Sequence, residues 1–201
     1  HGFGGAASNW TRVATALAER CRGLVVDLPG HGASSALPAP AETLDPYADR
    51  VGALLGRPAV LVGHSLGAVV ALRLAQRHPG LARGVVLAGS AGISSGTRRS
   101  QRALTLVALV KPAKRIAPFR RTVSCNSRLR KLVFGAIAVA DPAALDPVAC
   151  EGFLAGSALH TGVRAAGDAL VRSDPRPDLN RVRCPTLVLH GARDVQVPLR
   201  D

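Results

Sequence analysis

Short runs of aliphatic and β-branched residues recur along the chain, separated by segments with helical periodicity. Four runs are continuous rather than alternating: Leu24–Leu28, Ala59–Gly63, Gly84–Ala88 and Thr186–Leu189. Continuous apolar runs are typical of parallel strands that are covered on both faces, whereas strands of a half-exposed antiparallel sheet alternate. The pattern therefore predicts an α/β fold built on a parallel sheet.

The segments between these runs favour helices. In Trp10–Glu19 the apolar positions Val13, Ala14 and Leu17 share one face, and Asn9 can serve as N-cap. We therefore expect an amphipathic helix that begins after Asn9.

Two further helices are predicted in the middle of the chain. Asp45 precedes Pro46, a favoured first helical residue, and Gly56 is expected to stop this helix after Leu55. Leu66–Gln76 is apolar almost all round, so we expect that helix to be buried.

Between residues 97 and 178 the strand-like runs disappear, and mostly helical sequence is interrupted at Pro112, Pro118, Pro142 and Pro147. A helical insertion within an α/β sheet is best interpreted as a cap or lid over a site. We predict a core formed by residues 1–96 and 179–201 and a helical cap over residues 97–178.

The composition is that of a globular domain, with 201 residues, of which 47% are hydrophobic and 19% charged. It excludes intrinsic disorder, and no apolar run approaches the roughly 20 residues that a membrane helix needs. The four cysteines are scattered without the spacing of a zinc site or a disulfide scaffold. We interpret them as small buried hydrophobes, which fits a reducing compartment, the cytoplasm.

Positive charge is concentrated in one segment. Of 26 basic residues, 11 lie between Arg98 and Lys131, where there is no Asp or Glu, and the remaining 15 face 13 acids. A solvated surface is the simplest interpretation, and a weak contact with an anionic substrate or membrane surface is the alternative. Only Phe119 and Phe134 lie in or beside this segment, so aromatic residues are not interleaved with the bases as in single-strand binders, and we expect no nucleic-acid partner.

The sequence contains two GxSxG motifs, at Gly63–Gly67 and at Gly92–Gly96. A nucleophile elbow needs a strand before the serine and a helix directly after it, and small residues two positions away on each side. Ser65 meets these requirements, whereas Ser94 leads into a polar, arginine-rich segment. We therefore predict Ser65 as the nucleophile and interpret Ser94 as part of a loop that opens the cap.

These motifs lie among other segments that resemble one family. The chain is similar to the α/β-hydrolase superfamily, most of all to its capped esterases and lipases, in HGFGG at 1–5, Trp10, VVDLPGHGAS at 25–34, LVGHSLGA at 61–68, RHPG at 77–80 and CPTLVLHGARDVQVP at 184–198. The resemblance covers both flanks of the chain and does not extend to the cap.

The resemblance implies a serine hydrolase mechanism with no metal and no organic cofactor. The oxyanion hole would be formed by the backbone N–H groups of Phe3 and Leu66. The carboxylate of the triad would be Asp194, in a position that favours it over Asp201. The substrate would be a small hydrophobic ester, lactone or thioester; carbon–carbon bond hydrolysis on the same triad and a non-catalytic binding protein remain the alternatives.

The base of the triad is expected outside residues 1–201. In the family's order the histidine follows the acid, and none of the six histidines occupies that position. His160 could contact substrate, and the other five, which are His1, His31, His64, His78 and His190, are interpreted as structural. We therefore expect these residues to be an internal part of a larger hydrolase, lacking its first strands and its last strand, and inactive alone.

Overall fold

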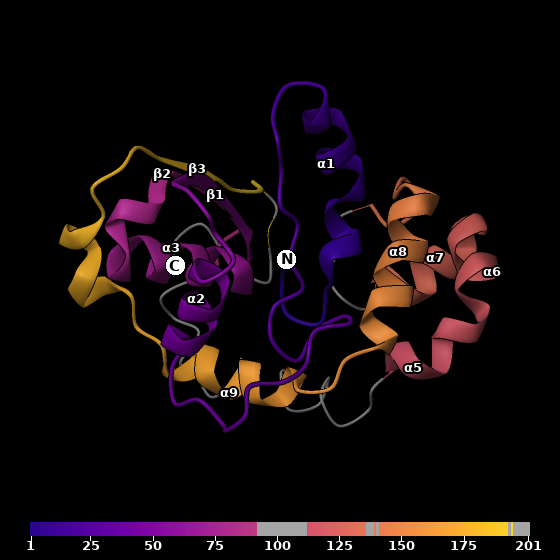
Figure 1. Cartoon of the computed structure of the whole chain (residues 1–201). Coiled ribbons are helices and arrows are strands. Elements are labelled where there is room, and N and C mark those ends of the chain that lie inside the picture. Colours follow the sequence, from indigo (N-terminus) through magenta and orange to yellow (C-terminus); the bar gives the residue numbers. More distant parts are fainter. Residues whose placement is uncertain (92–111, 136–138, 140, 193, 195–201) are drawn as a thin grey trace.

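The computed structural model describes residues 1–91, 112–135, 139, 141–192 and 194 (Figure 1). Its sheet contains β1 (Ala59–His64), β2 (Ala82–Ala88) and β3 (Thr186–Leu189), all parallel and in the order β1-β2-β3. β1 and β2 pack against α3 (Leu66–Arg77), which connects them. The parallel α/β architecture predicted from the continuous apolar runs is confirmed.

The strand predicted at Leu24–Leu28 does not form. The segment has no regular secondary structure, and the described sheet contains only the three strands named above. A strand is defined by its ladder of hydrogen bonds, and no described strand lies beside this segment. Leu24 is consequently 60% exposed, although Leu28 at the end of the run is buried.

The first helix also differs from its prediction. Ala7–Trp10 forms the 3-10 turn η1, and α1 covers Thr11–Ala18. Asn9 does not cap α1; its side-chain oxygen accepts a hydrogen bond of 2.6 Å from the Ala6 N–H. No residue of α1 is buried, so the predicted apolar face is half-exposed, with Val13 at 47%.

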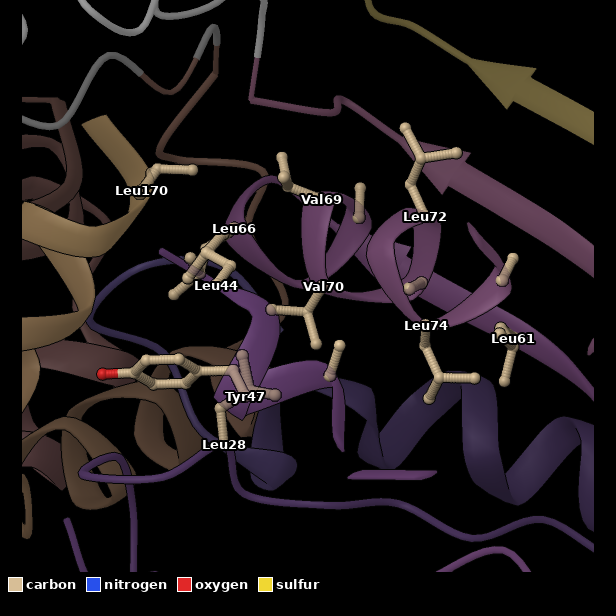
Figure 2. Close-up of a cluster of buried hydrophobic side chains, with 14 of the residues drawn as sticks. Leu28, Leu44, Tyr47, Leu61, Leu66, Val69, Val70, Leu72, Leu74 and Leu170 are labelled. Atoms are coloured by element: carbon tan, nitrogen blue, oxygen red, sulfur yellow. The ribbon is translucent and has the colours of Figure 1, made fainter. Parts of the chain in front are cut away.

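The main hydrophobic cluster is centred on α3. Ten of the twelve residues of this helix are buried, which confirms the prediction for Leu66–Gln76. α2 (Asp45–Gly52) packs against it, and Figure 2 shows Leu44 and Tyr47 beside Leu66 and Val70. After α2 the chain continues through turns to Leu55, where the sequence pattern expected the helix to end.

A second hydrophobic cluster lies among the helices that follow. These helices are α5 (Pro112–Ile116), η4 (Ala117–Phe119), α6 (Arg120–Cys125), α7 (Ser127–Gly135) and α8 (Pro147–Ala158). Val123, Phe134, Cys150 and Leu154 form its buried centre. In Figure 1 this group and the sheet lie on opposite sides of α1 and the N-terminus.

α9 (Val163–Arg172) lies within the predicted cap range, but its buried residues Ala166, Ala169 and Leu170 belong to the main cluster. The short 3-10 turns η2 (Pro79–Leu81) and η5 (Arg176–Arg181) complete the described elements. None of the described helices has the length and hydropathy of a membrane span. Only Cys150 is fully buried as interpreted, because Cys21 and Cys125 are exposed and Cys184 is partly exposed.

Candidate active site

Ser65 occupies a sharp turn between a strand and a helix. β1 ends at His64 and α3 begins at Leu66, so Ser65 is the single residue between them. It has a φ of 50° and a ψ of −116°, and it is the only non-glycine residue with a positive φ in the described part of the chain. Such strain persists only where the surroundings fix it, and it is concentrated at functional sites.

The glycines two residues away are required by this geometry. A Cβ atom on Gly63 would collide with the Gly67 carbonyl oxygen and with Ala68. A Cβ on Gly67 would lie 2.6 Å from the His1 carbonyl oxygen, because the N-terminal loop, residues 1–5, passes directly over the start of α3. No larger side chain fits at either position without moving the backbone.

The N-terminal loop is docked onto the elbow by its backbone. The Gly67 N–H donates a hydrogen bond of 3.0 Å to the His1 carbonyl. A Cβ on Gly2 would lie 3.2 Å from Ser65 Cβ, so this loop is in direct contact with the serine. The Phe3 and Leu66 N–H groups donate to no residue that the structure describes. Two backbone donors beside Ser65 are therefore available to an external acceptor.

Asp194 lies after β3 and beside the end of β2. Its N–H donates to the Gly191 carbonyl at 3.1 Å. Its carboxylate oxygen Oδ2 is 4.0 Å from His190 Nε2 and would be 3.7 Å from a Cβ on Gly89. The His64 ring lies equally close to that point, and desolvation lowers the His64 pKa while the Asp194 charge opposes this shift.

Asp201 and Ser94 lie outside the described residues, as do residues 98–111 of the basic segment.

All six histidines are described, and none forms a hydrogen bond with Ser65 Oγ. His78 Nε2 pairs with Asp49 at 2.7 Å. His1 accepts from the Leu28 N–H, and His31 lies fully buried with Nδ1 3.1 Å from the Pro29 carbonyl. Burial lowers the His31 pKa to about 4, so the ring is neutral at pH 7.

His160, which the sequence left as a possible substrate contact, uses both ring nitrogens within the protein. Its Nδ1 accepts from the Gly32 N–H at 3.0 Å, and its Nε2 donates to the Gly4 carbonyl at 2.7 Å. Both ring nitrogens are thus used by backbone groups of two core loops. Burial lowers its pKa, which favours the neutral ring.

Sequence reasoning missed Asp27, which links the loop around Gly32 to the start of η1. One carboxylate oxygen accepts from the Ala7 N–H at 2.6 Å and the other from the Ala33 N–H at 2.9 Å. An aspartate in an otherwise apolar run, just before a glycine-rich loop, is the signal that could have indicated this role. Within the part of the chain that is described, no three His, Cys, Asp or Glu side chains are arranged to hold a metal ion.

Comparison with known proteins places this geometry in a family. The model of the alpha/beta hydrolase family matches residues 1–201. The chain belongs to the alpha/beta hydrolase family. It is 32% identical over 201 residues to a pimeloyl-[acyl-carrier protein] methyl ester esterase of Chromobacterium violaceum, in a match that covers 99% of this chain and 76% of the esterase.

A second relative of this α/β hydrolase matches a shorter stretch. A 2-succinyl-6-hydroxy-2,4-cyclohexadiene-1-carboxylate synthase of Escherichia fergusonii is 40% identical over 114 residues, 52% of this chain and 42% of the synthase. Among solved structures, a thermophilic esterase from Thermogutta terrifontis superimposes with a TM-score of 0.67 at 24% identity, covering 100% of this chain and 72% of the esterase. The chain therefore has the α/β-hydrolase fold, and it is a hydrolase of that fold.

Proposed function

We propose that this α/β hydrolase is a serine esterase that cleaves small hydrophobic carboxylic esters or related acyl compounds through a covalent acyl-enzyme. The strained turn at Ser65 carries the proposal, because a strand–serine–helix turn exposes the hydroxyl to a substrate. The esterase relative, which the chain matches over almost its whole length, supports esters as the substrate class.

In the proposed reaction Ser65 Oγ attacks the carbonyl carbon of the ester while its proton passes to an imidazole base. The oxyanion that forms accepts hydrogen bonds from the Phe3 and Leu66 N–H groups. The imidazolium returns the proton to the departing alcohol, and water then hydrolyses the acyl-enzyme. The Asp194 carboxylate orients the imidazole and stabilises its charge.

The base is assigned to a histidine outside residues 1–201, after Asp194 in chain order. This assignment follows the order of the triad in the family and the absence of any hydrogen bond between Ser65 Oγ and the six described histidines. Residues 97–178, except α9, which packs into the main cluster, are proposed to form the cap that provides the walls of an apolar pocket over Ser65. Carbon–carbon bond hydrolysis would use the same groups and differ only in the bond broken.

The basic segment is proposed to form a weak contact with an anionic surface. Its described bases on α5, α6 and α7 include Lys114, Arg121, Arg128 and Lys131, all exposed. Exposed charge of one sign attracts anions in a salt-dependent way. Co-sedimentation with anionic liposomes is expected to be weak and to disappear at about 0.5 M salt; an absence of salt-sensitive binding would remove this part of the proposal.

Labelling with a fluorophosphonate followed by peptide mass spectrometry tests the nucleophile in the full-length protein. The adduct is expected on Ser65, and Ser65→Ala should abolish both labelling and ester hydrolysis, with turnover falling by about 10⁴-fold or more. Ser94→Ala, in the second GxSxG motif, is the matched control and should retain both. Labelling at another residue, or activity that survives in Ser65→Ala, would overturn the proposal.

A further inference from the structure

The end of α8 holds the N-terminal loop through one carbonyl group. The Gly4 carbonyl accepts a hydrogen bond of 2.5 Å from Ser157 Oγ and one of 2.7 Å from His160 Nε2. Gly4 has a φ of 69°, the left-handed conformation that lets the chain turn here. Ser157 is only 4% exposed, so its hydroxyl is committed to this contact.

The orientation of the Gly4 carbonyl determines the orientation of the peptide groups before it. In a planar trans peptide the C=O and the following N–H point in opposite directions, and the described chain contains no cis peptide bonds. The Gly4 carbonyl points to α8, so the Gly5 N–H points back, and it donates to the Gly2 carbonyl at 3.0 Å. The Phe3 N–H belongs to the same peptide as the Gly2 carbonyl and therefore points the opposite way.

The hydrogen bond from the Gly32 N–H fixes the tautomer of the His160 ring. Because the Gly32 N–H can only donate, His160 Nδ1 must be unprotonated, and the proton must lie on Nε2, facing Gly4. The two residues after His160 add two hydrogen bonds to the second glycine-rich loop, because the Thr161 and Gly162 N–H groups both donate to the Gly30 carbonyl at 3.0 Å. Residues 157–162 thus fix both glycine-rich loops of the core.

We propose that Ser157 and His160 are positioning residues of the oxyanion hole, which hold the Gly4–Gly5 peptide and through it aim the Phe3 N–H at the substrate oxygen. This inference rests on the proposed function, in which the Phe3 N–H binds the oxyanion. Neither residue touches substrate. Their effect is expected in the transition state, where negative charge develops on that oxygen, and not in the binding of the ground-state ester.

The test measures kcat and KM for hydrolysis of p-nitrophenyl butyrate by full-length Ser157→Ala and His160→Ala proteins. The enzyme concentration used for kcat is that of reactive Ser65, determined by titration to saturation with a fluorophosphonate. Each substitution is expected to lower kcat about tenfold, and the double substitution about 100-fold, while KM changes by no more than about twofold. Outright loss of an oxyanion donor lowers kcat by about 10²- to 10³-fold. Affinity for a trifluoromethyl ketone, whose adduct places an oxyanion in the same hole, should fall by the same factor as kcat.

Two further variants separate positioning from general packing. His160→Gln should recover most of kcat, because its carboxamide offers a donor for Gly4 and an acceptor for Gly32. Ser8→Ala is the matched control: Ser8 Oγ donates to the Gly152 carbonyl at 2.7 Å, across the same contact with α8 but away from Gly4. Its kcat should be unchanged.

The outcomes distinguish this inference from the function on which it rests. If Ser65→Ala is inactive while Ser157→Ala and His160→Ala keep their kcat, or if Ser8→Ala loses as much as they do, the positioning inference is wrong and the esterase proposal stands. If Ser65→Ala remains active, the proposed function itself fails.

Discussion

The N-terminal loop, residues 1–5, and the second glycine loop, residues 28–33, are both rich in glycine but use their backbone groups differently. In the second glycine loop the N–H groups of residues 30–33 all donate to acceptors within the protein. In the N-terminal loop the Gly2 and Gly4 carbonyls each accept two hydrogen bonds, while the Phe3 N–H donates to none of the described residues. One loop pairs its donors within the protein, whereas the other leaves several N–H groups, that of Phe3 among them, without an acceptor among the described residues.

The difference shows that glycine content alone does not distinguish a loop that pairs its backbone donors from one that leaves them unpaired. Most backbone groups of a folded chain are paired, so an account of their hydrogen bonds narrows the search for groups left to a ligand. If this interpretation is right, damage to the second glycine loop should reduce stability first, whereas damage to the N-terminal loop should reduce catalysis first.

The largest effect on stability is expected for Gly32→Ala. Gly32 has a φ of 49°, and a Cβ there would collide with the Asp27 carboxyl group, which binds the N–H groups of Ala7 and Ala33. Strain and the disrupted carboxylate together should cost about 3 kcal/mol of unfolding free energy. Urea denaturation measures this; a loss below about 1 kcal/mol would show that the loop is not a rigid support.

An effect of at most similar size is expected from acid through His31, at the centre of the second glycine loop. Its pKa is about 4 in the fold because of burial, against 6.5 for an ordinary histidine. The unfolded chain therefore binds more protons between these values, so stability falls as the pH drops from about 6.5 to about 4, by about 3 kcal/mol at most. His31→Phe should flatten this pH dependence; an unchanged slope would assign it to other groups.

The smallest change in stability is expected for Gly4→Ala in the N-terminal loop. A Cβ on Gly4 would meet no atom within 4 Å, so only the φ of 69° opposes the substitution, at about 1 kcal/mol. Because relief of this strain would rotate the peptides that aim the Phe3 N–H, kcat should still fall about tenfold. Gly56→Ala, equally open and without a positive φ, is the control; an unchanged kcat in Gly4→Ala would contradict the proposed division between the loops.

The parts of the fold that sequence could predict are those in which one local pattern determines the result. α3 is apolar all round and is buried, and the turn at Ser65 follows from glycines that no other residue could replace. The prediction of a strand at Leu24–Leu28 was wrong, because a strand needs a neighbouring strand. The amphipathic helix predicted after Asn9 forms as α1, but its apolar face stays half-exposed, because burial of such a face needs a packing partner. Neither partner can be read from the local sequence.

The contacts made by residues 157–162 could not be predicted for a similar reason. The bonds from Ser157 and His160 to Gly4 join residues more than 150 positions apart, and each side chain alone looks like an ordinary polar residue near a helix end. The same holds for α9, whose amphipathic pattern indicates a buried face but not which of the two clusters covers it.

The most direct test of the central claim is acid-quenched mass spectrometry of the full-length protein during turnover of a slow ester substrate. The proposed reaction passes through an ester of Ser65, so the peptide containing this residue should gain the mass of the acyl group and lose it once the substrate is exhausted. Steady turnover with no acylated peptide, or with the acyl group on another residue, would contradict the assignment of Ser65 as the nucleophile.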